Sequence, residues 1–485
     1  MEPGGGRLVL VTGATGYIGG RLVRPLLERG YRVRAGVRNP RVISARYGSD
    51  VEAVRSDALE RETVAAALEG VDTAFYLVHL LGQSRDYAAL DRQSATIFAE
   101  EAARAGVRRI VFLGGLGQET AHLSEHLASR HEVGRILASS GILTLEFRAS
   151  IVIGSGSTSY EMIRNLVEKL PVMPTPRWTR MAAQPVAIED VLAYLIAAIE
   201  VPADRSRVLE IGGPDVVSYD DVLRTYARFR GLKRLVIPVP VLTPRLSGGW
   251  LSLFTPAQAR VGKQLAESLR FPTVVTDPAA RELFPAIEPM GFERALERAA
   301  ANEDREVAET RWCDALGACT LEHPPERTRH DGRLIDSRTI RVACPPEAAF
   351  GPISCIGGRT GWYSWDFLWG LRGFLDQVFG GVGSRRGRRD PSCLLPGETL
   401  DFWRVVEVDP PRSLLLQAEM KAPGRGWLRY EVEPDPETGG SVVHQTAIFD
   451  PKGVFGLAYW YLLVPFHAFV FNGALAGIER ECGKL

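Results

Sequence analysis

The sequence predicts an α/β protein with an N-terminal doubly wound parallel sheet and a C-terminal α+β domain. Three observations carry this prediction. The chain opens with a strand, a glycine-rich turn and a helix; strand and helix patterns then alternate through the first 150 residues; and from Ser337 onward several strands precede a single apolar helix. Alternation of this kind is typical of a parallel sheet with helices on both faces, and segregated strands and helices are typical of α+β domains.

The first element is an apolar strand at residues 8–12, and its composition is that of a buried parallel strand. Gly13, Gly16 and Gly19 follow, and residues 18–27 carry apolar side chains at helical spacing. In this setting Gly13 permits a tight turn, Gly16 lets backbone approach a pyrophosphate, and Gly19 lets the helix pack on the strand. The order therefore predicts a dinucleotide site, because a glycine-rich turn without a ligand does not explain glycines at a helix start. The candidate cofactor-binding residues of the loop are Gly13, Thr15, Gly16, Tyr17, Ile18 and Gly19.

The second strand, residues 31–37, favours NADP over NAD. An NAD site usually places Asp or Glu about 20 residues after the glycines, on the ribose 2′-hydroxyl. No acidic residue lies between Arg29 and Gly48, and Arg38 stands in that place with Arg34 nearby. A guanidinium suits a 2′-phosphate through charge-assisted hydrogen bonds. The alternative is that both arginines are solvated charges at a strand end, which leaves NAD open.

The remaining elements of the first 150 residues continue the alternation. Strands are predicted at 51–55, 73–78, 109–113 and 143–148, and helices at 60–68, 87–105 and 124–139. Residues 151–300 hold shorter helices, many prolines and strand candidates at 185–188 and 208–211. We expect residues 1–150 to bind the cofactor and 151–300 to form the substrate side of the cleft.

A polar, breaker-rich linker is predicted at 301–335, followed by a domain over 336–485. Its strand candidates are 338–342, 399–408, 413–419, 426–432 and 441–449. No charged residue occurs from Val454 to Ile478, which is long enough to span a bilayer. Pro465, His467 and Asn472 favour a buried C-terminal helix, with membrane contact through 454–478 as the alternative. The arginine run 385–389 is interpreted as an exposed loop or as an anionic lipid contact.

Composition narrows the class of protein. Lys plus Arg and Asp plus Glu both number 58, so the net charge of zero argues against a nucleic-acid binder. The six cysteines lack C-x-x-C spacing and indicate reduced thiols of a cytoplasmic protein. No signal peptide precedes the first strand, and no residue cluster suggests a metal site.

The loop Thr12–Gly19 resembles the cofactor loop of extended and atypical short-chain dehydrogenases/reductases, in particular the NmrA-like group and relatives of the 39-kDa subunit of respiratory complex I. Asp57, after the third strand, matches the Asp that contacts adenine in that superfamily. Segments 105–111, 184–191 and 211–214 extend the resemblance over about residues 7–300. The resemblance implies an NAD(P)-binding oxidoreductase.

Residues 335–485 resemble a bacterial domain of unknown function that follows such reductases, on motifs at 356–362, 368–373, 386–389, 401–404 and 445–449. That domain is thought to be related to the START/polyketide-cyclase (SRPBCC) helix-grip fold, which encloses an apolar ligand. The resemblance therefore implies a small-molecule or lipid-like ligand. Trp362, Tyr363, Trp365 and Trp369 are interpreted as core, or as a wall of that cavity with Arg359 or Arg372 as its polar anchor.

The catalytic pattern departs from the superfamily. A working reductase of this kind carries Tyr-x-x-x-Lys on the helix after the fifth strand and a hydroxyl at that strand's end. Here the strand ends in Gly114-Gly115-Leu116-Gly117, and the helix carries His126-x-x-x-Arg130. An imidazole at position 126 is expected to act as an acid or base near pH 7, whereas Arg130 is suited to hold ribose but not to shuttle protons. The alternative places both on the exposed face of an amphipathic helix.

His79, just after the fourth strand, is a third catalytic candidate, with a hydrogen-bonded structural histidine as its alternative. Three functions stay open. The first is hydride transfer to a small or lipid-like carbonyl or quinone, the second is nucleotide binding without turnover in a redox sensor or assembly protein, and the third is a membrane-surface protein. The substrate, the reaction direction and the oligomeric state do not follow from the sequence.

Overall fold

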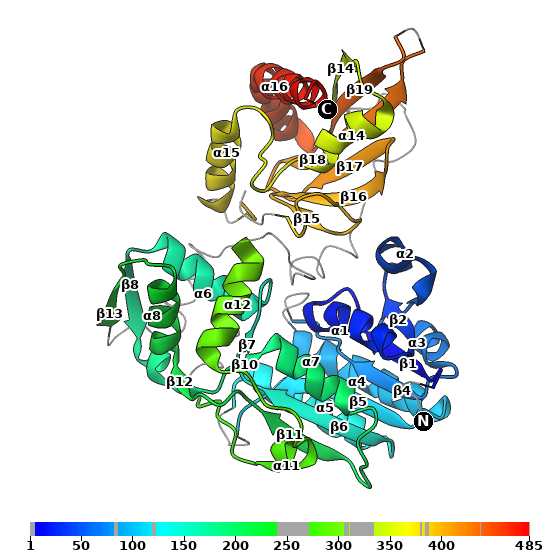
Figure 1. Ribbon diagram of the computed structural model, residues 1–485, viewed down its shortest axis with the longest axis vertical. Helices are drawn as coiled ribbons and strands as arrows, with labels where there is room; N and C mark the ends of the chain where they lie inside the picture. The colour runs from blue at the N-terminus through cyan, green and yellow to red at the C-terminus, as the bar shows by residue number, and fades with distance from the viewer. Residues whose placement is uncertain are drawn as a thin grey trace. The chain divides into compact units, whose positions relative to one another are not determined.

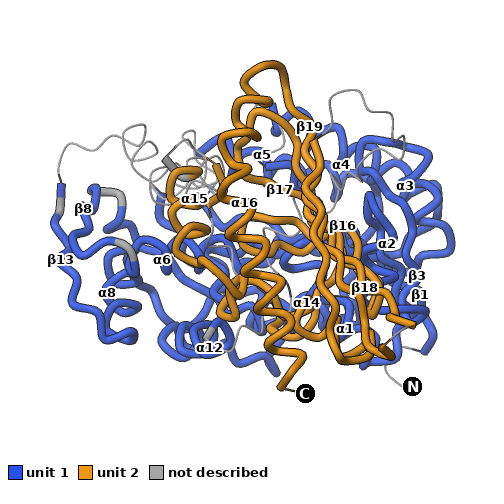
Figure 2. The backbone as a smooth tube through the Cα atoms, turned by 90° about the horizontal axis from the view of Figure 1, so that it is seen from above, with its two compact units in different colours: residues 1–315 blue, residues 316–485 orange. Residues whose placement is uncertain are grey.

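The computed structural model describes residues 5–81, 86–118, 123–239, 271–304, 310, 334–378, 381–383, 388–436 and 438–484. The chain divides into two compact units, residues 1–315 (unit 1) and 316–485 (unit 2), coloured separately in Figure 2.

Unit 1 is built on a seven-stranded parallel sheet with the order β11-β6-β5-β4-β1-β2-β3 (Figure 1). The strands are β1 (Leu8–Thr12), β2 (Arg32–Val37), β3 (Val51–Arg55), β4 (Thr73–Tyr76), β5 (Arg109–Gly115), β6 (Leu143–Ala149) and β11 (Arg207–Ile211). The strand order reverses direction between β1 and β4, and ligands bind at such a switch point. The predicted doubly wound parallel sheet is confirmed.

Helices cover both faces of this sheet, and the alternation of side chains along β1 explains why. Val9 and Val11 pack into the core with α1, α2, α7 and α11, whereas Leu8 and Leu10 pack into a second core with α3, α4 and α5. The helices are α1 (Tyr17–Glu28), α2 (Pro40–Tyr47), α3 (Arg61–Leu68), α4 (Tyr87–Arg104), α5 (Glu125–Ala138), α7 (Ile188–Ala197) and α11 (Ala279–Leu283). Helix α2 was not among the predicted elements.

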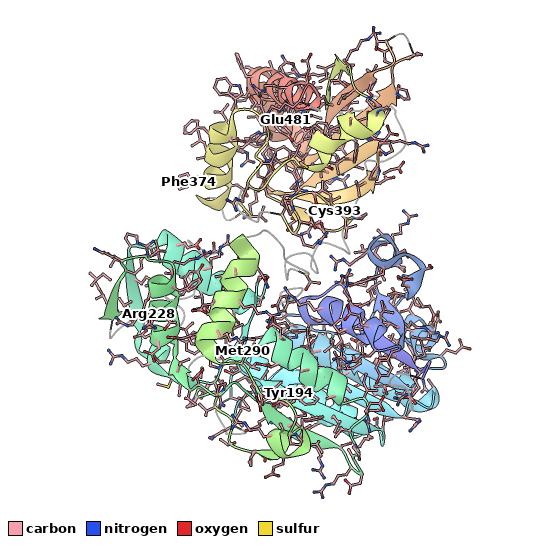
Figure 3. All side chains as sticks on the ribbon, in the orientation of Figure 1. Tyr194, Arg228, Met290, Phe374, Cys393 and Glu481 are labelled. Atoms are coloured by element: carbon pink, nitrogen blue, oxygen red, sulfur yellow. The ribbon has the colours of Figure 1, made fainter. Side chains whose placement is uncertain are left out.

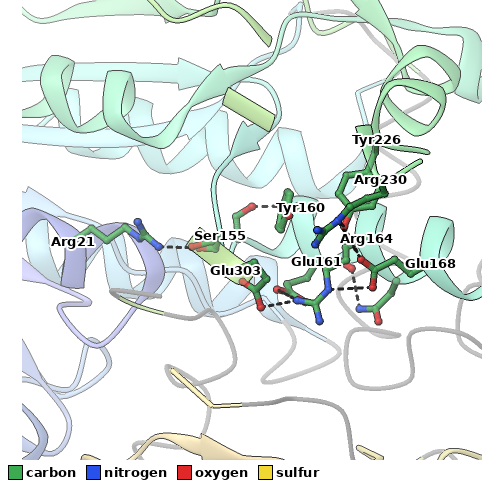
Figure 4. A network of polar contacts seen from close by, with 11 residues as sticks. Arg21, Ser155, Tyr160, Glu161, Arg164, Glu168, Tyr226, Arg230 and Glu303 are labelled. Carbon is green, nitrogen blue, oxygen red and sulfur yellow. Dashed lines mark hydrogen bonds and ion pairs between the residues drawn. The ribbon is translucent and has the colours of Figure 1, made fainter. Parts of the chain in front are cut away.

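The rest of unit 1 forms a smaller layer around a third core. It contains α6 (Thr158–Lys169), α8 (Tyr219–Phe229), α12 (Phe292–Asp304), β7 (Val152–Ile153), β8 (Val172–Pro176), β9 (Ala182–Ala183), β10 (Val186–Ala187), β12 (Val217–Ser218) and β13 (Leu235–Val239). Arg164 of α6 joins these helices, because it pairs with Glu303 of α12 at 2.6 Å and with Glu168 at 3.5 Å (Figure 4). Tyr226 of α8 donates to Glu168 at 2.8 Å, so one network ties three helices together.

Unit 2 is a six-stranded antiparallel sheet with the order β14-β19-β18-β17-β16-β15 and helices packed against it. Its strands are β14 (Leu334–Val342), β15 (Thr399–Leu400), β16 (Trp403–Asp409), β17 (Ser413–Ala418), β18 (Gly424–Pro434) and β19 (Ser441–Pro451). Its helices are α14 (Pro346–Ser354), α15 (Asp366–Val378) and α16 (Gly453–Cys482). The predicted α+β class is confirmed, and the relation to the helix-grip fold stays a prediction.

Two features of unit 2 differ from the predictions. The single strand expected at 399–408 breaks at Asp401, whose φ of 53° leaves the extended region and whose carboxylate accepts hydrogen bonds from Trp362 Nε1 and the Gly358 amide. Arg388 is buried and donates to three backbone carbonyls, and Arg389 pairs with Glu398, so neither fits the exposed loop or the lipid contact. Residues 385–387 lie outside the described part of the chain.

Helix α16 confirms the predicted C-terminal helix but not its complete burial. Only 22% of its most apolar 18-residue window is buried, although the helix is long and apolar enough to cross a membrane. One side, including Trp460, Phe471, Leu475 and Ile478, packs into the core of unit 2. The four cysteines in the described residues, Cys344, Cys355, Cys393 and Cys482, carry free thiols.

Candidate functional site

The glycine loop between β1 and α1 is closed to side chains at all three glycines. Gly13 has a φ of 65°, and a Cβ there would lie 2.8 Å from the Leu77 carbonyl oxygen. A Cβ on Gly16 or Gly19 would lie 2.9 or 2.4 Å from the Gly13 carbonyl oxygen. No side chain caps the start of α1 and no acid stands in its first turn. The loop therefore keeps backbone N–H groups and the positive end of the helix dipole available to an anion.

Arg38 lies beside this loop, at the carboxyl end of β2. Thr12 pairs with Gly36 in the parallel register, so the chain passes from β2 to Arg38 at the edge of the sheet where β1 leads into the glycine loop, and the Arg38 side chain is exposed. Arg34 does not join it, because its guanidinium donates to the Ala67 and Glu69 carbonyls and pairs with Glu52. Arg38 is thus the arginine that follows β2 at the loop's edge of the sheet.

Asp57 follows β3 at the same edge of the sheet. Its carboxylate accepts the Leu59 amide at 3.0 Å, and its own amide donates to Thr63 Oγ1 at 2.9 Å. These bonds fix the turn into α3 and the position of the carboxylate within it.

The sheet brings together His79 and His126, two of the catalytic candidates. Their ring centroids lie 5.3 Å apart, although the residues follow different strands. His79 Nδ1 lies 3.1 Å from Asp91 Oδ2, and the Leu80 amide donates to Asp91 Oδ1 at 3.0 Å. A carboxylate only accepts hydrogen bonds, so Asp91 places the His79 proton on Nδ1 and leaves Nε2 as an acceptor.

His79 Nε2 is buried and has no hydrogen-bond partner among the described residues. Burial, and next the charge of Arg130, lower the pKa of His79, so the imidazole is neutral at pH 7. Burial alone would raise the pKa of Asp91, but the hydrogen bond from His79 and the nearby charge of Arg130 lower it overall. His79 is therefore a neutral imidazole, and its hydrogen bond from Nδ1 to the Asp91 carboxylate fixes the orientation of the ring.

His126 and Arg130 do not lie on an exposed helix face. Arg130 is buried and donates to the Val78 carbonyl at 3.2 Å and the Leu113 carbonyl at 2.7 Å, and its guanidinium lies over the Phe112 ring. It therefore ties the segments after β4 and along β5 together. Burial, with His79 and Arg130 as like charges, lowers the pKa of His126 to about 3. A proton on His126 is thus disfavoured at neutral pH.

Packing is tight where β5 ends in Gly114 and Gly115. A Cβ on Gly115 would lie 2.7 Å from Leu127 Cδ2, and one on Gly114 would lie 3.2 Å from Glu146 Oε1. Glu146 is buried and pairs with Arg148 at 2.7 Å on the same face of β6. In turn, Gly134 of α5 makes room for this carboxylate, since a Cβ there would lie 2.0 Å from Glu146 Oε2.

The residues that sequence reasoning missed are Asp91, Ser129, Glu146 and Arg148. Ser129 Oγ lies 3.5 Å from Asp91 Oδ2, and all four are buried. In the sequence they stand out as charged or polar residues within a strand or on the apolar side of a helix. Buried charges of this kind cluster at functional sites.

Unit 2 contains a cavity of about 290 Å³ between the sheet, α15 and α16. Trp369, Trp403 and Arg372 line it, together with apolar residues of β17–β19 and α16, whereas Arg359 does not. The Trp369 and Trp403 Nε1 atoms are buried without a partner among the described residues. Trp362 is core: it packs on Phe402 at 6.2 Å, so the tryptophan cluster divides between core and cavity wall.

The strand order and the glycine loop at its switch point define unit 1 as a Rossmann-type dinucleotide-binding fold of the short-chain dehydrogenase/reductase kind. The chain belongs to the NmrA-like family, which matches residues 6–249. Residues 329–474 match a protein family of unknown function, DUF2867.

Curated relatives and solved structures match unit 1. A ceramide reductase of Caulobacter vibrioides is 28% identical over 263 residues, which are 53% of this chain and 82% of that protein. A 3 beta-hydroxysteroid dehydrogenase/Delta 5→4-isomerase of Mycobacterium tuberculosis is 28% identical over 33% of this chain and 51% of its own length. A nucleoside-diphosphate-sugar epimerase structure from Staphylococcus aureus matches with a TM-score of 0.50 at 16% identity, covering 60% of this chain and 99% of that one. The two curated relatives are oxidoreductases by name, and the epimerase shares the fold.

Proposed function

We propose that unit 1 is an NADP(H)-dependent oxidoreductase that acts on a small or lipid-like carbonyl compound, a quinone, or the corresponding alcohol. The observation that carries the proposal is the glycine loop, in which no Cβ fits at Gly13, Gly16 or Gly19. The NmrA-like family and relatives named as a reductase and a dehydrogenase support it.

The residues present fit a nicotinamide dinucleotide. The Gly16 amide donates to the Gly13 carbonyl at 2.8 Å, so the amides of Thr15, Tyr17, Ile18 and Gly19 would hold the pyrophosphate. Asp57 would lie at the adenosine end, and Arg38 would pair with a 2′-phosphate. When bound, the cofactor supplies or accepts a hydride. The choice of NADP over NAD depends on Arg38. It is consistent with β2, which contains no acidic residue that could hold a ribose 2′-hydroxyl.

His79 is the group that handles the proton in this proposal. Its neutral Nε2 would accept the O–H proton of an alcohol substrate, and Asp91 would stabilise the resulting imidazolium. In the reverse direction the imidazolium gives the proton to the carbonyl oxygen. Arg130 stays on its carbonyl partners and positions the strand ends, and His126 flanks His79.

Nucleotide binding without turnover is the second candidate, and two observations favour it. Glycines stand at positions 114 and 115, where the usual hydroxyl is missing and an added Cβ would crowd Glu146 and Leu127, and the low pKa of His126 removes it as an acid at neutral pH. The two candidate functions differ only in whether a substrate binds within reach of His79.

Turnover of NADPH against a panel of aldehydes, apolar ketones and quinones separates them. His79→Asn keeps a donor to Asp91 but removes Nε2, so we expect turnover to fall about a hundredfold with unchanged NADPH affinity. The matched control is His444→Asn in unit 2, where Nδ1 bonds to Thr339. NADPH binding without turnover on any member of the panel supports the second candidate.

For unit 2 we propose an apolar ligand in the cavity, with its oxygen atom near Arg372 and the two indole N–H groups. The unpartnered donors in an apolar chamber support a ligand with one polar end. Mass spectrometry of molecules extracted from the purified chain tests this, and Trp369→Phe should weaken the retention of an oxygen-bearing ligand. A cytoplasmic location stays a prediction.

A further inference from the structure

Helices α15 and α16 expose large apolar side chains together. Among them are Phe367 and Phe374 on α15 and Phe455, Leu462 and Phe469 on α16, which are 76, 62, 84, 70 and 62% exposed. We call these five residues the apolar face; Figure 3 labels Phe374 on α15. Soluble proteins rarely gather such side chains on one surface unless that surface binds something.

The exposed apolar residues of unit 1 are aliphatic or less exposed. Val172, Leu235 and Ile237 lie on the paired strands β8 and β13, and Val208 and Val216 lie on or next to other strands. These five are at most 58% exposed, as is common at a protein surface, whereas each residue of the apolar face is at least 62% exposed.

The geometry of α16 excludes a simple transmembrane span for the folded unit. Trp460, Phe471 and Ile478 on its other side are buried against the sheet and α14, whereas Phe455 and Phe469 are exposed. A helix with one side fixed to a protein core and one apolar side free is suited to lie in the interface plane of a bilayer. No charged side chain interrupts the helix from Val454 to Ile478.

Positive charge borders the apolar face where α16 begins. Lys421, Arg425 and Lys452 are exposed there, and the Lys452 amide donates to the Pro423 carbonyl at 2.8 Å, which holds the β17–β18 turn beside the helix start. Asp450 lies 3.5 Å from Arg425 and offsets one of these charges. Cations beside exposed aromatic residues match the anionic headgroups of a bilayer surface.

The cavity of unit 2 is lined in part by side chains of α15 and α16 that are also exposed to solvent. Leu371, Leu375 and Phe466 line the cavity and are 44, 43 and 50% exposed. An apolar molecule that leaves a bilayer at the apolar face would reach the cavity along apolar side chains alone.

We propose that unit 2 docks on an anionic lipid bilayer through the apolar face, with α15 and α16 in the interface plane and the cavity open toward the lipid. The partner is the bilayer surface itself. Docking does not depend on the reaction proposed for unit 1, and NADPH binding would persist if it failed.

Co-sedimentation of the full chain with vesicles tests this proposal. We expect binding to vesicles of phosphatidylcholine mixed with phosphatidylglycerol, and weaker binding to phosphatidylcholine alone. The double variant Phe455→Ser/Phe469→Ser should lose about tenfold or more in affinity. Lys452→Glu should weaken binding only to the vesicles with phosphatidylglycerol.

The matched control is Ile335→Ser, which is 57% exposed on β14. Its neighbour Asp336 faces His467 of α16, so alternation along the strand puts Ile335 on the opposite face of the sheet. This variant should bind vesicles like the wild type. Circular dichroism melts and NADPH titration check that each variant folds.

Three results would overturn the proposal: no binding of the wild type to either vesicle, equal binding by the double variant, or a wild-type dimer that the double variant turns into a monomer. The last would show that a second copy covers the face.

A second experiment needs no polar substitution. Brominated phosphatidylcholine should quench the tryptophan fluorescence of the docked chain, and this quenching should fall in Trp365→Phe because Trp365 is 54% exposed beside the apolar face. Unchanged quenching would also contradict docking through α15.

Discussion

Both units bury polar atoms without a partner among the described residues, but they differ in the apolar side chains that they expose. Unit 1 buries the acceptor His79 Nε2, and its exposed apolar residues are at most 58% exposed, whereas unit 2 exposes Phe455 and Phe469 at 84 and 62%. Each arrangement costs free energy, because buried polar atoms lose hydration and exposed apolar surface orders water. The proposals for a proton acceptor in unit 1 and a docking surface in unit 2 depend on this contrast.

Neighbouring residues of α16 give the largest contrast. Phe471 is buried and Phe469 is 62% exposed. Phe471→Ala should lower the free energy of unfolding by about 4 kcal/mol, through lost burial and the cavity left behind, and Phe469→Ala by less than about 0.5 kcal/mol. Chemical denaturation measures both. Equal losses in the free energy of unfolding would mean that Phe469 is also buried. Unit 2 would then not expose the apolar side chains that distinguish it from unit 1.

Asp91→Ala should cost unit 1 about 3 kcal/mol, since it leaves the Leu80 amide and His79 Nδ1 without their buried acceptor. The control is Asp204→Ala, whose carboxylate is 82% exposed and lies 3.6 Å from Arg207. Thermal unfolding compares the two variants. A small shift in the unfolding temperature of Asp91→Ala would show that this carboxylate does not hold His79 and Leu80 in place.

The stability of unit 1 should fall as the pH drops below 6.5. The pKa of His126 is lowered to about 3 and that of His79 is also lowered, so the unfolded chain takes up protons that the folded chain refuses. We expect a loss of about 1 kcal/mol per pH unit between pH 6.5 and 4, and a shallower slope in His126→Asn. Denaturation curves at several pH values test this, and an unchanged slope in the variant would contradict the burial of His126.

Arg38→Ala should weaken NADPH binding about tenfold and leave NADH binding unchanged, because only the former carries the 2′-phosphate. Arg32→Ala, an exposed arginine at the other end of β2, is the control. Fluorescence titration provides the affinities. Equal losses for both nucleotides would remove the argument for NADP.

Much of unit 1 follows from local sequence. The glycine loop and the alternating elements predict the doubly wound parallel sheet, which is confirmed. The spacing of His126 and Arg130 left open whether they reach the strand ends or lie on an exposed helix face. Asp91 was not predicted because its role depends on His79, twelve residues earlier and on another element. Arg34 was misjudged for the same reason, since its partners lie at the end of α3.

Unit 2 was less predictable, and its apolar composition explains why. Helix α15 was missed because residues 366–378 mix glycine and aromatic residues, and α16 is apolar all round, so its sequence does not tell the buried side from the exposed one. Side-chain packing decides between them. The break at Asp401 likewise depends on a contact with Trp362, 39 residues away.

The most direct test of the account is titration of NADPH into the wild type and Gly19→Ala. A Cβ at Gly19 would lie 2.4 Å from the Gly13 carbonyl oxygen, so the loop must open while the remainder of the fold stays in place. We predict saturable binding by the wild type and about a hundredfold weaker binding by the variant, with unchanged affinity in Gly351→Ala, where the added Cβ meets nothing within 4 Å among the described residues. No binding by the wild type, or equal binding by Gly19→Ala, would contradict the assignment of this loop as the cofactor site.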